Sequence, residues 1–68
     1  MWTADIGCWE KGLNIDLPGV KNLSEAIDLA EKILRKTDFY HAGIKSGDST
    51  YVVQIYHNGK IVWDYMSS

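Results

Sequence analysis

The chain has a single cysteine, Cys8, and a single proline, Pro18, among its 68 residues. One cysteine excludes an intrachain disulfide and a metal site built from several thiolates, and it favours a reducing compartment. No stretch approaches the roughly 18 apolar residues that a membrane-spanning helix needs. The first residues also lack the basic start of a signal peptide. We therefore expect a cytoplasmic protein without a membrane segment.

The net charge is also small: seven basic and nine acidic residues give a formal net charge of −2 at pH 7. Binding to nucleic acid depends largely on basic residues that neutralise phosphates. This balance predicts a protein that does not bind nucleic acid directly. The apolar fraction of 46% and aromatic fraction of 12% are typical of a globular chain. At this length we expect one small domain over residues 1–68.

The firmest local pattern predicts a helix that starts after Asn22. Asn22 can cap the helix, and Glu25 three residues later completes a pattern like a capping box. Apolar residues then recur at helical spacing on one stripe: Leu23, Ala26, Ile27, Ala30, Ile33 and Leu34. Acidic residues come early and basic residues late, which suits the helix dipole. We expect the helix to end within residues 36–38.

Alternation of apolar and polar residues predicts strands on both sides of this helix. Two strands precede it, over residues 1–9 and 13–17, and Pro18-Gly19 ends the second. Three follow it, over residues 39–45, 51–57 and 60–66. The order β-β-α-β-β-β predicts an α+β domain, in which one helix covers one face of a mostly antiparallel five-stranded sheet.

The last two strands form a hairpin around Asn58-Gly59, a strong signal for a two-residue type I′ turn. Such a turn pairs His57 with Lys60. Further along, the expected pairs are Ile55 with Val62, Gln54 with Trp63, and Val53 with Asp64. One face of the hairpin is then largely aliphatic: Tyr51, Val53, Ile55, Val62 and Met66. The other face is richer in aromatic residues: Val52, Tyr56, Ile61, Trp63 and Tyr65.

One helix in a domain this small covers only one of these faces well. We expect it to cover the aliphatic face, leaving the aromatic face to bind a partner, since Trp and Tyr are enriched at binding hot spots. The candidate partner-binding residues are Gln54, Tyr56, Ile61, Trp63 and Tyr65, together with His41 of the third predicted strand. A one-residue change in the loop before residue 51 would reverse the faces of that strand. The alternative is that the aromatic face is the core.

Nothing in the chain predicts catalysis. His41 and His57 are the only histidines, and no spacing requires either to meet Cys8 or an aspartate in a catalytic or metal-binding arrangement. Cys8 alternates with apolar residues, so we expect a small buried side chain. There is no phosphate-binding glycine motif and no nucleophile elbow. We therefore expect no enzyme activity, no cofactor and no metal.

The element order and several short motifs resemble a family of inhibitors. The motifs are Leu23-Ser24-Glu25-Ala26 at the helix start, Tyr40-His41-Ala42-Gly43, Asn58-Gly59-Lys60 and Trp63-Asp64. Over nearly the whole chain, this layout resembles small phage-encoded anti-CRISPR proteins of the type I-F inhibitor group. The resemblance implies a non-enzymatic inhibitor in the host cytoplasm. It would bind a Cas subunit of a crRNA-guided surveillance complex and block recognition of target DNA.

A second resemblance covers only about residues 12–34. The run from Leu13 to Gly19, followed by Ser24-Glu25-Ala26, is similar to a segment of HicB-type antitoxins. It implies an antitoxin or another small protein-binding module as the alternative function. Both resemblances imply a protein that inhibits by occupying the surface of a partner.

Overall fold

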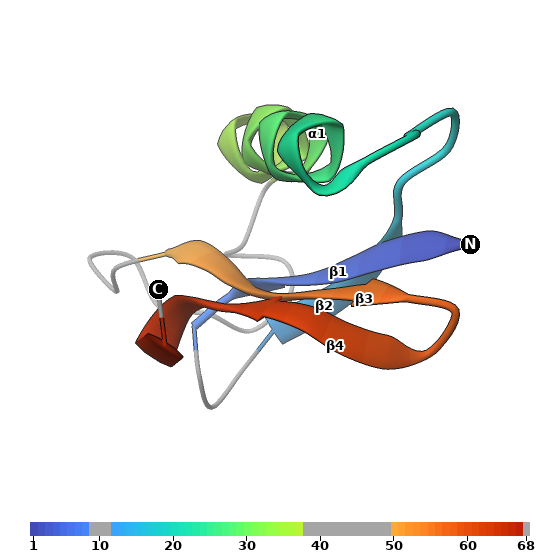
Figure 1. Cartoon of the computed structure of the whole chain (residues 1–68). Helices are drawn as coiled ribbons and strands as arrows, with labels where there is room; N and C mark the ends of the chain where they lie inside the picture. The colour runs from blue at the N-terminus through green and yellow to red at the C-terminus, as the bar shows by residue number, and fades with distance from the viewer. Residues whose placement is uncertain (9–11, 38–49, 68) are drawn as a thin grey trace.

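A computed structural model describes residues 1–8, 12–37 and 50–67 of the chain. Its elements are β1 (Trp2–Gly7), β2 (Gly12–Asp16), α1 (Leu23–Lys36), β3 (Tyr51–His57) and β4 (Lys60–Asp64), followed by a 3-10 turn, η1 (Tyr65–Ser67). The strands form an antiparallel sheet of order β2-β1-β3-β4, and α1 lies across one face of it (Figure 1). The described part is therefore α+β with four strands. The predicted strand over residues 39–45, including His41, lies outside the described residues.

The predicted helix is confirmed, with its start at Leu23 and its end at Lys36. The side-chain oxygen of Asn22 accepts a hydrogen bond from the Glu25 amide at 2.9 Å, which satisfies one of the unpaired amides of the first turn. In return, the Glu25 carboxylate accepts a hydrogen bond from the Lys21 amide at 3.3 Å. At 14 residues, α1 is too short and too polar to cross a membrane, and the described part of the chain contains no helix that could.

The core lies between α1 and the sheet face that it covers, here named the inner face. Ala4, Ile6 and Ile55 on the strands, and Ala26 and Ala30 on the helix, are completely buried. Larger residues that are only half-buried pack around them: Trp2, Leu13, Ile15, Leu23, Ile27, Ile33, Leu34 and Trp63. Two alanines at the contact allow the helix to lie close to the sheet. The predicted apolar stripe of the helix therefore faces the core, as expected.

The Asn58-Gly59 turn is also confirmed. Asn58 has φ 54° and Gly59 has φ 83°, the two positive values that a type I′ turn requires. His57 pairs with Lys60, as predicted. His57 also pairs with Trp2 of β1, and the two rings stack with their centroids 4.3 Å apart. The hairpin tip is thus fixed to the first strand by an aromatic contact.

A β-bulge changes the hairpin beyond its tip. Tyr56 pairs with Ile61, but the next residue, Ile55, pairs with Trp63, so Val62 is an extra residue in β4. The extra residue reverses the facing of everything after it. Trp63 consequently lies on the inner face and packs against the core, whereas the sequence had placed it on the opposite face.

The three expected pairs beyond the bulge are therefore wrong, because strict alternation assumes a ladder without an extra residue. Instead, Gln54 pairs with Asp64, and β4 ends there. The predicted strand continued to residue 66. It stops early because the Asp64 carboxylate accepts a hydrogen bond from the Met66 amide at 2.8 Å, which turns the chain into η1.

A second bulge lies in β3 opposite β1. Asp5 pairs with Gln54, whereas the next residue, Ile6, pairs with Val52, so Val53 is the extra residue. Val52 joins Ile6 in the core cluster beneath α1, whereas Val53, although equally buried, does not belong to that cluster. The predicted faces of these two valines are therefore reversed. Because they are identical side chains, the sequence pattern could not show which one the helix covers.

Candidate partner-binding surfaces

The bulge at Val62 and the turn at Asp64 divide the predicted binding residues between two surfaces. Gln54, Tyr56 and Ile61 lie on the sheet face that α1 does not cover, here named the outer face. Trp63 lies on the inner face, and Tyr65 lies in η1. The structure thus separates residues that the sequence had placed together, while His41 lies outside the described residues.

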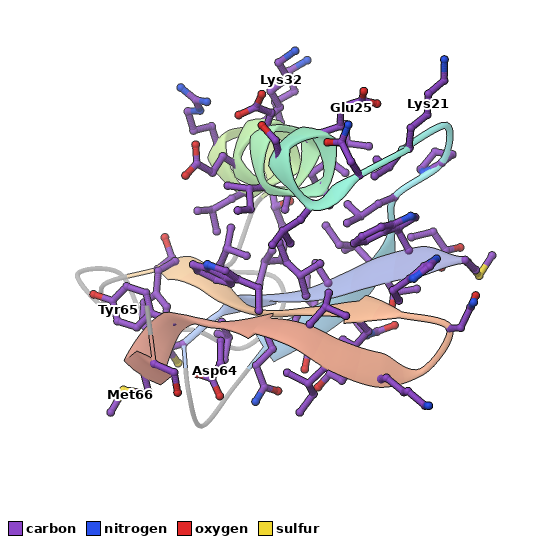
Figure 2. The ribbon with its side chains drawn as sticks, in the orientation of Figure 1. Lys21, Glu25, Lys32, Asp64, Tyr65 and Met66 are labelled. Carbon is purple, nitrogen blue, oxygen red and sulfur yellow. The ribbon has the colours of Figure 1, made fainter. Side chains whose placement is uncertain are left out.

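The outer face carries a polar row with one residue from each strand. Asn14, Asp5, Gln54 and Asp64 are successive cross-strand neighbours on β2, β1, β3 and β4. Asn14 Nδ2 donates to Asp5 Oδ1 at 2.9 Å, and Gln54 Nε2 donates to Asp64 Oδ2 at 3.3 Å. Figure 2 shows Asp64 pointing away from α1. These contacts link the side chains of neighbouring strands on the face opposite the helix.

Tyr56 is held within this row. Its hydroxyl lies 2.8 Å from Asp5 Oδ2 and 2.7 Å from Gln54 Oε1, so one hydroxyl hydrogen serves two acceptors. Partial burial raises the pKa of Tyr56 above its usual value. The hydrogen bond to Asp5, and the negative charges of Asp5 and Asp64, raise it further. At neutral pH, Tyr56 is therefore a protonated donor already engaged inside the protein.

A cavity of about 270 Å³ lies beside this row. It is lined by Asp5, Cys8, Gly12, Asn14, Val53 and Gln54. Cys8, predicted to be buried, is half-buried here. Among the residues that the structure describes, no three His, Cys, Asp or Glu side chains are grouped so that they could hold a metal ion.

A larger hollow of about 470 Å³ lies between the C-terminal half of α1 and the β3–β4 strands. We name it the α1–β4 groove; its lining residues are Glu31, Leu34, Arg35, Thr50, Tyr51, Val52, Trp63 and Tyr65. Tyr65 is 49% exposed, and its ring lies against that of Tyr51 with centroids 4.4 Å apart. The groove therefore combines apolar and aromatic walls with one acid and one base from the helix.

Sequence reasoning identified Trp63 and Tyr65 in this groove but missed Leu34 and Tyr51. Leu34 lies on the apolar stripe of the helix and was assigned to the core, which it also contacts. Tyr51 begins β3 and was assigned to the face beneath the helix. Their position in the chain could have indicated this. Leu34 lies in the last turn of α1 and Tyr51 is the first residue of β3, and side chains at the ends of elements are often only partly covered.

The edge of β4 adjoins the groove. Ile61 is 54% exposed and Val62 is 43% exposed, and both line a shallow hollow beside Trp63. Met66, two residues beyond the end of the strand, is 72% exposed. Within the described sheet, β4 pairs with β3 alone. Exposed apolar side chains thus lie along a strand at one side of the described sheet.

Neither the outer face nor the groove contains a grouped set of metal ligands among the described residues. Comparison of the chain with protein-family models, curated proteins and solved structures finds no match.

Proposed function

We propose that this chain is a non-enzymatic inhibitor that binds another protein through the α1–β4 groove and the adjoining edge of β4. The observation that supports it is the exposed apolar strip of Ile61, Val62, Tyr65 and Met66 beside a groove lined by Trp63. Contiguous apolar surface is uncommon on proteins that work alone, and it marks interaction sites when it borders a concave region.

The groove is suited to tight contact because part of it is already ordered. The Tyr51 ring supports the Tyr65 ring, so little freedom is lost when a partner covers them. Glu31 and Arg35 supply polar groups along the helix side of the groove. Aromatic residues at the centre with charged residues at the rim are the usual arrangement of a protein interface.

The proposed target is a Cas subunit of a crRNA-guided surveillance complex, with inhibition by obstruction of target DNA recognition. Support comes from the resemblance in motifs and from the element order up to α1 and in the last hairpin. The net charge of −2 favours contact with protein over contact with DNA. A bound chain would then act in the cytoplasm of a host cell.

The test uses a purified type I-F surveillance complex and measures its binding to target DNA while the chain is titrated in. Wild type should inhibit, and Tyr65→Ala should raise the inhibitory concentration by about tenfold or more, as expected for an aromatic hot spot. Asp28→Ala, on an exposed position of α1, is the matched control and should inhibit like wild type.

Two results would contradict the proposal. If wild type leaves DNA binding unchanged at saturating concentration, this complex is not the target. If wild type inhibits but folded Tyr65→Ala inhibits equally well, the target stands and the groove is not the contact surface.

The antitoxin alternative rests on the segment that joins β2 to α1. Pro18 and Gly19 form a turn, with Gly19 at φ 75°, and the helix cap Asn22 follows three residues later. This matches the turn-then-helix order that the resemblance to HicB-type antitoxins implies. Capture of a toxin from a host lysate, in place of a Cas subunit, would favour this function.

A further inference from the structure

We infer that the α1–β4 groove binds an arginine side chain of the partner protein, with the guanidinium held by aromatic rings and by the Glu31 carboxylate. The inference rests on the proposed function in one respect, that the partner binds at this groove. It goes further by naming the chemistry that the groove selects. Three features of the groove each favour a cation: its rings, its carboxylate and the helix end beside it.

The first feature is the aromatic lining. Tyr51 of β3, Trp63 of β4 and Tyr65 of η1 all border the groove. The rings of Tyr51 and Tyr65 already lie together, with centroids 4.4 Å apart and planes tilted by 31°. The face of an aromatic ring carries partial negative charge and attracts a cation within about 6 Å of the ring centroid. Three such rings around one hollow therefore favour a cationic occupant over an anionic one.

The second feature is the full negative charge of Glu31 on the helix side of the groove. Glu31 is exposed, and its carboxylate forms no ion pair within the described part of the chain. An apolar side chain that covered this carboxylate would remove it from water without compensation, which is costly. A guanidinium avoids that cost, because it can donate two parallel hydrogen bonds to one carboxylate.

The third feature is the end of α1. Leu34 and Arg35 line the groove and belong to the last turn of the helix, where unpaired carbonyl groups form the negative end of the helix dipole. A cation in the groove would lie close to these carbonyl groups. The helix end therefore adds to the attraction from the rings and from Glu31.

Among the described lining residues, Arg35 alone opposes a cation. Its Nε donates to the backbone carbonyl of Glu31 at 3.3 Å, so the side chain lies back along its own helix. Arg35 is exposed and long enough to keep its guanidinium in water while a partner covers the groove. Arg35 should therefore weaken the binding of a cation without preventing it, and its removal should strengthen that binding.

The groove suits arginine better than lysine. A guanidinium is planar, stacks on aromatic rings and is more weakly hydrated than an ammonium. Its fork of donors also matches the geometry of a carboxylate, whereas an ammonium acts as a point charge. A hollow of about 470 Å³ with aromatic walls and one acid therefore fits the flat group and its apolar stem.

The test titrates the full chain with Nα-acetyl-arginine methylamide, a probe whose only charge is the guanidinium. Amide and indole NMR signals report binding. Wild type should bind the probe with a dissociation constant on the order of millimolar, with the largest shifts at Tyr51, Trp63 and Tyr65. The matching lysine probe should bind several-fold more weakly, and the leucine probe more weakly still.

Two charge variants should change the affinity for the arginine probe in opposite directions. Glu31→Gln should weaken binding by about threefold, and Arg35→Gln should strengthen it by about twofold. Lys32→Gln removes the same charge as Arg35→Gln from an exposed position outside the described lining, where Figure 2 shows Lys32 pointing away from the sheet. This control should bind the probe like wild type.

A ring variant separates the attraction of a cation to aromatic rings from simple apolar contact. Tyr65→Leu keeps apolar bulk without a ring and should weaken binding of the arginine probe by about threefold. Tyr65→Phe keeps the ring and should bind the probe like wild type.

The inference would be overturned by a wild-type chain that does not bind the arginine probe, or that binds the leucine probe equally well. Charge effects of the opposite signs for Glu31→Gln and Arg35→Gln would overturn it too, since they would indicate an anionic occupant. These measurements involve no Cas protein. A chain that binds the probe as expected but does not inhibit the surveillance complex would therefore contradict the proposed target and leave the chemistry of the groove standing.

Discussion

Ile55 and Trp63 lie opposite each other across the β3–β4 ladder, on the side of the sheet that α1 covers. This pairing gives Trp63 two roles, since its side chain packs against the core and also lines the α1–β4 groove. Trp63 therefore belongs both to the packing that stabilises the fold and to the proposed binding surface.

Trp63→Ala should lower the free energy of unfolding by about 2 kcal/mol, less than the cost at a fully buried Trp because this side chain is only half-buried. Chemical denaturation measures the change. Trp63→Phe, which keeps a ring against the core, is the control and should lose less. An unchanged midpoint for Trp63→Ala would contradict the inward placement of this residue.

Ala30→Leu should destabilise the chain by roughly 1–3 kcal/mol. Ala30 is completely buried where α1 crosses the sheet, so added methylene groups would push the helix away. Lys32→Leu puts leucine at an exposed position of the same helix and serves as the control. A thermal melt compares them, and equal transitions for the two variants would mean that the helix does not lie this close.

Asn58→Ala should cost about 1 kcal/mol, because alanine adopts the positive φ of this position less readily than asparagine. Asn58→Gly should retain most of the stability, since glycine accepts the same conformation. Denaturant titration measures the loss, and amide chemical shifts of the hairpin report its structure. If alanine and glycine behaved alike, the turn conformation would not be the cause.

The stability of the fold should fall in alkaline solution because of Tyr56. The pKa of its hydroxyl is higher in the folded chain than the ordinary value of 10.0, so the fold favours the protonated phenol. This stabilising contribution is complete below pH 10.0 and is lost as the pH rises through the higher folded value.

Denaturation of wild type and Tyr56→Phe at several pH values measures this effect. Near neutral pH, the variant should be about 1 kcal/mol less stable, because it lacks the hydrogen bond of the hydroxyl. The difference between the two proteins should narrow as the pH rises beyond 10.0. A difference that stays constant across this range would contradict the link to ionisation of Tyr56.

Elements with strong local signals were predictable from the sequence. Asn22 and Glu25 fixed the start of α1, and Asn58-Gly59 fixed the hairpin tip, because capping and positive φ depend on a few adjacent residues. The four described strands were predicted to within two residues at each end, and β4 ends early because Asp64 turns the chain into η1.

The facing of residues beyond the bulges was not predictable in this way. An extra residue at Val62 or Val53 depends on which side chains best fill the space beneath α1, and that is a property of the packed molecule. The candidate site changed for the same reason. Trp63 lies on the inner face instead of the predicted outer one. Tyr56 belongs to a polar row whose residues are brought together only by the pairing of all four strands.

The two outer strands of the described sheet differ in the side chains that they expose, and this difference bears on where a partner can bind. β4 has the exposed apolar pair Ile61 and Val62, whereas the opposite edge, β2, exposes the polar residues Asn14 and Asp16. Polar and charged side chains discourage an edge from accepting another strand. The β2 side is therefore expected to stay in contact with water when the proposed partner covers the β4 side.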